Sequence, residues 1–211
     1  MTNPASAAPP GPLFPAPRDD LCLDFANTRY WRGSDPATET LHSALDLLDW
    51  SAASGGIDPA MVADLRARWA RRPDEAMPVF GWAMAVREAI YGTFAAVAGG
   101  DDPDPADLAA LNEALRTTPS RSALEWIDDR FAWRVAPLAG VDALLVPVLW
   151  AAGDLLAGSR VERVRRCAND RCGWLFLDDS KSANRRWCSM SQCGNRAKAH
   201  RHYAKRRQAE G

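Results

Sequence analysis

Two short cysteine segments decide how this chain is organised: CANDRC at Cys167–Cys172 and CSMSQC at Cys188–Cys193. Within each segment four residues separate the two cysteines, and fifteen residues lie between the segments. Two tight turns that each carry two thiols can converge on one tetrahedral ion. The spacing therefore predicts a single metal centre. Its expected ligands are Cys167, Cys172, Cys188 and Cys193.

Zinc is the metal that this pattern favours, because four thiolates complete its tetrahedral shell in a closed structural site. A closed shell leaves no position for water or substrate, so we expect one structural zinc ion per chain and no catalytic role for it. Iron–sulfur clusters also use four thiolates, and disulfides or unrelated free thiols remain alternatives. The remaining cysteine, Cys22, stands in an apolar segment and is expected to be buried.

The residues around the cysteines predict a small β-hairpin followed by a helix. One strand is expected over 163–168 and the return strand over 173–177. Ser189 followed by Gln192 is a capping-box pattern, which predicts a helix over about 190–207. Such a short segment has too little core to fold alone, so metal binding and folding should be coupled.

The N-terminal body is predicted to be an α+β domain, mostly helical with a small antiparallel sheet. Apolar residues at helical spacing, together with Asp-Pro pairs that start helices, predict five helices. They are expected over 39–51, from Asp58-Pro59, over 79–98, from Asp104-Pro105, and over 141–157. Alternating apolar residues predict an extended segment over 21–28 and a β-hairpin over 123–135.

Composition divides the chain into three parts. Residues 1–18 are rich in Pro and Ala and are predicted to form a flexible lead-in. Gly158-Ser159 is the best boundary between an α+β domain at 19–158 and a zinc module at 159–211. We expect the body to have a core of its own. No secretion signal and no apolar run long enough to span a bilayer is visible, which predicts a cytoplasmic protein without a membrane partner.

Charge is distributed unevenly along the chain. Residues 1–159 carry 12 Arg and Lys against 22 Asp and Glu, whereas residues 160–211 carry 14 against 5. This split is typical of a polyanion-binding tail on an acidic body. The alternative interpretation is that the two parts simply attract each other.

Double-stranded DNA is the partner that the basic tail favours. Lys198, Arg201 and Lys205 recur at spacings of three and four residues, so they form one stripe on the predicted helix. The candidate DNA contacts are Arg185, Arg186, Arg196, Lys198, Arg201 and Lys205. The rival interpretation is that the tail docks onto an acidic protein.

Three residues of the body are candidates for binding a small-molecule effector. Asp24 and Asn27 could line a pocket, or they could cap local turns. Arg87 lies on an apolar helix face beside Glu88, so it is either a buried ion-pair member or the anchor for a carboxylate ligand. We find no nucleophile elbow, phosphate loop or dinucleotide fingerprint, and predict no catalytic residues and no enzymatic activity.

The segment RRWCSM at 185–190, followed by CGNR at 193–196 and Lys198, resembles the CGNR zinc-finger family. LDFANT at 23–28 and VREA at 86–89 resemble the ABATE domain that usually precedes this finger. The resemblance implies a bacterial, stress-induced transcription regulator whose zinc module contacts DNA. The body would then sense a ligand or form a homodimer, and an adaptor that docks onto an acidic protein is the alternative.

Overall fold

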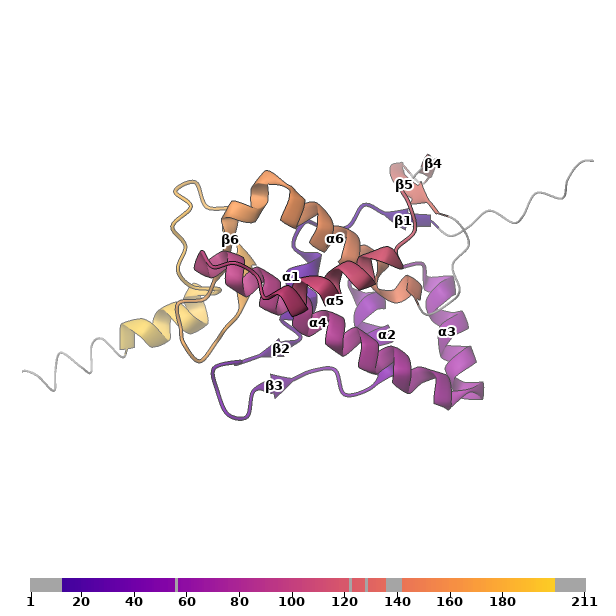
Figure 1. The fold of residues 1–211 in the computed structure, drawn as a ribbon, viewed down its shortest axis with the longest axis horizontal. Helices are drawn as coiled ribbons and strands as arrows, with labels where there is room; N and C mark the ends of the chain where they lie inside the picture. The colour runs from indigo at the N-terminus through magenta and orange to yellow at the C-terminus, as the bar shows by residue number, and fades with distance from the viewer. Residues whose placement is uncertain (1–12, 56, 122, 128, 136–141, 200–211) are drawn as a thin grey trace, which may run out of the picture.

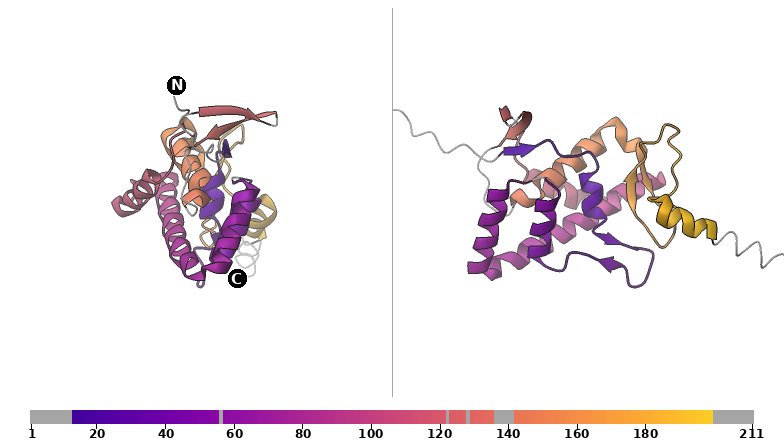
Figure 2. Two further views of the ribbon diagram at one scale, coloured as in Figure 1. Left: turned by 90° about the vertical axis from the view of Figure 1, so that its right-hand side faces the viewer. Right: turned by 180° about the vertical axis from the view of Figure 1, so that it is seen from behind.

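The long helix α4 (Ala76–Gly99) runs through the middle of the molecule and the other elements pack around it (Figure 1). The computed structural model describes residues 13–55, 57–121, 123–127, 129–135 and 142–199. The cysteine-rich segment lies at one end of the molecule and a three-stranded sheet lies toward the other. Figure 2 shows the same arrangement from behind and from the side.

Helices dominate the body, as predicted. The remaining α-helices are α1 (Leu21–Ala26), α2 (Ala44–Ala53), α3 (Pro59–Arg71), α5 (Pro105–Arg116) and α6 (Val146–Ala157). Short 3₁₀ segments are η1 (Pro73–Glu75), η2 (Asp142–Leu145) and η3 (Ser159–Arg163). Asp58 and Asp104 accept the N–H groups of Ala60 and Ala106, so both Asp-Pro pairs start helices as predicted. In the described residues, every helix is too short or too polar to cross a lipid bilayer.

The described residues also form three small antiparallel sheets. The largest has the strand order β1 (Leu13–Pro15), β5 (Arg130–Arg134), β4 (Ala123–Ile127), which confirms the predicted hairpin. The second pairs β2 (Arg29–Tyr30) with β3 (Thr38–Glu39). The third pairs β6 (Val164–Arg166) with β7 (Leu175–Leu177), as the sequence predicts for the segment that carries the first two cysteines. The predicted α+β class is confirmed.

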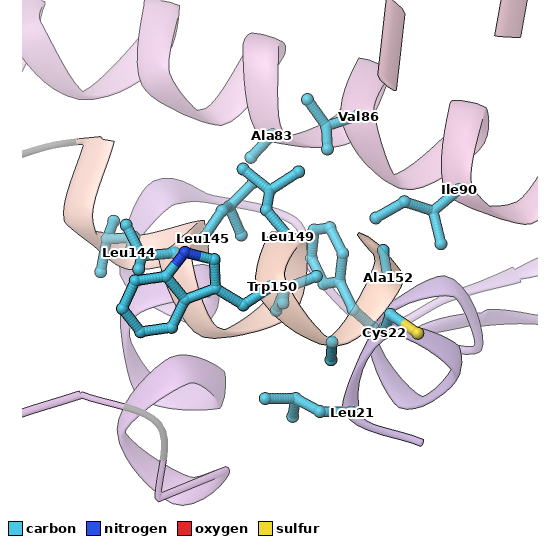
Figure 3. Close-up of a cluster of buried hydrophobic side chains, with 14 of the residues drawn as sticks. Leu21, Cys22, Ala83, Val86, Ile90, Leu144, Leu145, Leu149, Trp150 and Ala152 are labelled. Atoms are coloured by element: carbon cyan, nitrogen blue, oxygen red, sulfur yellow. The ribbon is translucent and has the colours of Figure 1, made fainter. Parts of the chain in front are cut away.

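The core lies where α1 packs against both α4 and α6 (Figure 3). Leu21 and Cys22 of α1 are buried beside Ile90 of α4 and Leu149 of α6. Cys22 has no exposed surface, and its burial among apolar side chains raises the pKa of its thiol. It is the small buried side chain that the sequence predicts.

The prediction of an extended segment over 21–28 is wrong, because residues 21–26 form helix α1. The apolar residues Leu21, Leu23 and Phe25 alternate with other types, but Cys22 and Ala26 are buried as well. A helix that contacts neighbours on two sides buries most of its positions and shows no amphipathic period. Six residues are too few to reveal the difference from sequence.

Part of the segment predicted as a flexible lead-in, residues 1–18, packs on the body. Residues 1–12 lie outside the described part, but Leu13–Pro15 forms β1 and pairs with β5. Phe14 is fully buried and meets the ring of Trp150 edge-on at a centroid distance of 5.6 Å. The burial of one aromatic ring holds this Pro-rich segment on the body. The helix expected over 141–157 appears as η2 and α6, with Pro147 in the first turn of α6.

The β6–β7 hairpin is part of the core of the body. Val164, Leu175 and Leu177 belong to the same buried cluster as α1, α4 and α6. Two strands of three residues cannot bury their apolar side chains against each other, so the hairpin packs these side chains against α1 and α4. The boundary at Gly158-Ser159 stays a prediction, but the body's core extends beyond it.

An ion-pair network on α4 joins the β2–β3 sheet to the core. Arg87 has only 3% of its side chain exposed, and both terminal nitrogens of its guanidinium bind the Glu39 carboxylate, at 2.7 and 2.6 Å. It also donates to Glu88 at 3.0 Å and to Thr28 at 3.2 Å. Burial raises the pKa of Glu39, but the hydrogen bonds from Arg87 and Leu41 outweigh it and the net pKa is lowered.

Replacing Glu39 by Gln should destabilise the protein by roughly 2–3 kcal/mol, because the charge of Arg87 stays buried without its main partner. The lowered pKa of Glu39 means that its contribution is complete above the unfolded-state pKa of about 4.3 and is lost as the pH falls through the folded-state pKa. The difference from the wild type, measured by urea unfolding, should therefore shrink below about pH 4. Asp49→Asn, which removes an exposed partner of Arg66, should change stability by less than about 1 kcal/mol. Equal effects of the two substitutions would contradict a structural role for the buried pair.

Candidate metal centre

Four cysteines from two separate turns meet at one point. Cys167 directly follows β6 and Cys172 lies in the turn before β7, while Cys188 and Cys193 flank the start of the C-terminal helix. All four sulfur atoms lie within 4.8 Å of one another. The Cys172 and Cys188 sulfurs are 3.7 Å apart, and those of Cys188 and Cys193 are 3.8 Å apart.

These distances fit a tetrahedral metal site. A zinc–sulfur bond of about 2.3 Å places the sulfurs of a regular tetrahedron about 3.8 Å apart. A disulfide needs about 2.05 Å, and all five cysteines are free. Three of the four cysteines are buried and Cys188 is half-buried, and the four sulfurs would complete a tetrahedral shell around one ion. The predicted ligand set for one zinc ion is brought together.

The hydrogen bond between the Cys172 and Cys188 thiols shifts the pKa values of these two groups in opposite directions. The S–H of Cys188 stabilises the neighbouring thiolate and lowers the pKa of Cys172 to about 5. The same contact raises the pKa of Cys188, and burial raises that of Cys193. The side chain of Asn169 donates to the Cys193 sulfur at 3.5 Å, which supports negative charge there. Binding a divalent cation through all four sulfurs would therefore release protons.

The second turn has the local structure that the sequence predicts. Ser189 is the N-cap, and its hydroxyl accepts the N–H of Gln192 at 3.4 Å. The helix begins at Met190 with a π-helical turn, η4 (Met190–Gly194), and continues as α-helix through residues 195–199. Cys193 lies in this first turn, where the backbone N–H groups favour a thiolate.

The candidate DNA contacts have different surroundings. Arg185 donates to the backbone carbonyls of Trp187 and Cys188 and lies 4.5 Å from the ring centroid of Phe176, so it holds the second turn together. Arg186 stacks on Trp187 at 5.5 Å, and Arg196 on Trp31 at 4.7 Å. Lys198 is exposed, while Arg201 and Lys205 lie outside the described residues.

A loop of the body forms backbone hydrogen bonds with the first cysteine turn. No sequence pattern predicted this contact. The backbone N–H groups of Arg32 and Gly33 donate to the carbonyls of Cys172 and Arg171, both at 3.3 Å. A Cβ on Gly33 would lie only 1.8 Å from the carbonyl oxygen of Asp170, so only glycine allows this approach. The only sequence signal is one glycine between two charged or polar residues, which is too common to interpret.

The Arg32 side chain fixes this loop on α4. Its guanidinium binds Glu88 at 2.6 Å and stacks on Tyr91 at 3.7 Å. The hydroxyl of Tyr91 in turn donates to the carbonyl of Gly173, which has a φ of 67°. Burial raises the pKa of Glu88, but hydrogen bonds from Arg32 and the charge of Arg87 reverse this, so the net pKa is lowered. α4 thus holds both the loop and the turn that carries Cys172.

Asn27, a candidate ligand residue, binds the hairpin instead. Its side-chain amide donates to the carbonyl of Leu175 at 2.8 Å and accepts the N–H of the same residue at 3.0 Å. The amide thereby forms the two hydrogen bonds that a neighbouring strand would form, and it satisfies the backbone N–H and carbonyl of Leu175 at the edge of β7. Arg87, another candidate, is fully engaged by Glu39 and Glu88, which favours the ion-pair alternative.

Asp24, the third candidate, borders a hollow between the body and the zinc module. The hollow measures about 540 Å³. Its aromatic lining consists of Tyr30, Trp31, Trp50 and Trp174. Asp24 forms an exposed ion pair with Arg18, and Asn27 also contributes to the wall. The structure thus brings Asp24 and Asn27 to one cavity and leaves Arg87 outside it.

Purified protein should contain one zinc ion per chain, and Cys188→Ser should lose most of it, because a closed four-thiolate shell tolerates no missing ligand. Elemental analysis measures this directly. Cys22→Ala, which removes a buried thiol remote from the centre, should keep the zinc. Iron in place of zinc, or full zinc content in Cys188→Ser, would contradict the assignment.

Asn27→Ala should cost about 1–3 kcal/mol in the free energy of unfolding, because the N–H and carbonyl of Leu175 lose their partners inside the protein. Urea unfolding measures the change. Asn112→Ala on the exposed side of α5 removes the same group and should change stability by less than about 0.5 kcal/mol. Were Asn27→Ala equally harmless, the amide would not hold the hairpin.

Comparison with known proteins agrees with the geometry. A family model for the CGNR zinc finger matches residues 163–206, the segment that contains all four clustered cysteines. A family model for ABATE, described as a putative stress-induced transcription regulator, matches residues 19–159. No similar protein was found among curated proteins. Because the ABATE match covers well over half of the chain, this protein belongs to the ABATE family and carries a CGNR zinc finger as its C-terminal part.

Proposed function

We propose that this protein is a non-enzymatic transcription regulator whose zinc finger contacts duplex DNA and whose N-terminal part senses a small ligand. The family descriptions support a regulator of this kind. The zinc site is closed by four protein ligands, so it serves to hold the basic module in shape.

The DNA proposal rests on the exposure of the basic side chains around the zinc site and on their lack of ion pairs with the described carboxylates. Between residues 163 and 198 none of them forms an ion pair with a described carboxylate. They are Arg163, Arg165, Arg166, Arg171, Lys181, Arg185, Arg186, Arg196 and Lys198. Most of them are exposed, so their charge is available to an external polyanion.

The arginines of the body are used differently. Most of those before residue 135 pair with a carboxylate of the body itself, as Arg87 does with Glu39 and Arg121 with Asp154. Among the described residues, one ion pair joins the basic tail to the body, between Arg160 and Asp19. The interpretation that the acidic body neutralises the basic tail therefore finds little support among the described residues.

Exposed residues of the module are the best phosphate contacts. Arg186 and Lys198 extend from the second cysteine turn and the helix after it, and Arg166 and Arg171 border the first turn. Arg185 is a weaker candidate, because it holds backbone carbonyls of the cysteine turn. Charged side chains beside a compact metal fold are typical of groove or phosphate recognition.

Zinc-loaded protein should bind labelled duplex DNA with an affinity that falls steeply with salt, because each neutralised phosphate releases counterions. With about four to six phosphate contacts, the log–log slope should be roughly −4 to −5. The double substitution Arg186→Ala/Lys198→Ala should weaken binding to all sequences and reduce the slope by about 2. Fluorescence anisotropy at several salt concentrations measures both quantities.

Arg66→Ala is the matched control, since Arg66 is an exposed arginine of the body on α3. It should leave the slope unchanged. If zinc-loaded protein does not bind duplex DNA even at low salt, the regulator proposal fails. The same unpaired charges would then favour docking onto an acidic protein.

A further inference from the structure

The hollow between the body and the zinc module has walls from both parts of the chain. Asp24 of α1, Tyr30 of β2 and Trp50 of α2 come from the body, and Trp174 and Cys188 come from the module. Its volume of about 540 Å³ is within the usual range for small-molecule sites. A molecule bound there would touch both parts at once.

Four aromatic residues are among the eleven that line the hollow. Tyr30, Trp31, Trp50 and Trp174 are all half-buried, so part of each remains accessible. The rings of Tyr30 and Trp174 lie 6.2 Å apart at 59°, an arrangement that leaves their faces at an angle to each other. The described residues give no hydrogen-bond partner to the Tyr30 hydroxyl or to the three indole N–H groups in this lining.

The residues that line the hollow carry only negative charge, while Arg18 pairs with Asp24 from outside the lining. Asp24 is the one charged residue among those that line it. Cys172 and Cys188 also line it, and a zinc ion held by four thiolates carries a formal charge of −2. The faces of aromatic rings attract cations for the same electrostatic reason. Trp31 already binds one, since the guanidinium of Arg196 lies 4.7 Å from its ring centroid.

We propose that this hollow binds a small organic cation of the alkylated-ammonium class. Aromatic faces replace the weak hydration of such a cation, and the Asp24 carboxylate, which pairs with the exposed Arg18 in the free protein, would balance its charge in place of that arginine. An anion would meet the carboxylate and the thiolates without any lining arginine or lysine to pair with. This inference rests on the ligand-sensing part of the proposed function and gives the chemical class of the effector.

The test uses isothermal titration calorimetry on zinc-loaded, full-length protein. The probes are benzyltrimethylammonium, and choline compared with its neutral carbon isostere 3,3-dimethylbutan-1-ol. Both cations should bind, and choline should bind at least about ten-fold more tightly than the isostere, which lacks only the charge. The bound state should also raise the thermal midpoint by roughly 3–6 °C at ten times Kd.

Substitutions locate the site. Asp24→Asn should weaken benzyltrimethylammonium binding about three- to ten-fold, whereas Asp49→Asn, which removes another exposed and arginine-paired carboxylate, should not. Trp174→Leu should weaken binding at least about ten-fold, and Trp126→Leu, on the remote and exposed strand β4, should not. Because Trp174 also packs on the cysteines, zinc content is measured for each variant, and Tyr30→Leu replaces it if zinc is lost.

The proposal is overturned if neither cation binds at millimolar concentration, if the neutral isostere binds as tightly as choline, or if Asp24→Asn and the aromatic variants bind like the wild type. The calorimetry is carried out without DNA, so an absence of cation binding leaves the DNA proposal standing. Conversely, cation binding without any duplex binding would support this site and reject the DNA role.

Discussion

The position of four sulfur atoms is the constraint on which the C-terminal part of this fold depends. The segment from the end of β7 to the C-terminal helix buries few apolar side chains of its own, and Cys193 and Gly194 are the buried members of its last turn. One divalent ion replaces that missing core by joining two turns that are fifteen residues apart in sequence. The carbonyls of Cys172 and Arg171 accept the backbone N–H groups of Arg32 and Gly33 of the body. The body loop that α4 holds is thus joined directly to the first cysteine turn.

The distribution of carboxylates explains why most arginines of the body form ion pairs and most of those around the zinc site do not. In the body, burial of Arg87 is tolerable only because carboxylates satisfy it from two sides. In the module, the metal and its thiolates form a compact negative centre, and Arg185 binds the nearby carbonyls rather than a carboxylate. Most of the other basic groups between residues 163 and 198 are exposed, and none of them forms an ion pair with a described carboxylate, which suits contact with a polyanion.

The sequence predicted those features that depend on local patterns. The four ligands follow from cysteine spacing, the helix starts at Asp58, Asp104 and Ser189 follow from capping side chains, and the hairpin at 123–135 follows from alternation. Features that depend on distant contacts were missed. The burial of α1 on two sides removed its helical period, and β1 is held on the body by its pairing with β5 and by the burial of Phe14. The pairing of Asn27 with Leu175 joins residues 148 positions apart, and no single-sequence pattern encodes such a partner.

Trp31 connects the two proposals physically. Its backbone has a φ of 55°, an unusual value for a bulky residue, and it leads directly into the loop that grips Cys172 and Arg171. The ring lines the hollow and also carries Arg196, one of the candidate DNA contacts. An organic cation bound in the hollow would compete with Arg196 for the face of this ring. A shift of Arg196 on ligand binding would then change the charge available for contact with DNA. Ligand and DNA would then be coupled through one side chain, and by thermodynamic linkage DNA would change the affinity for the cation by the same factor.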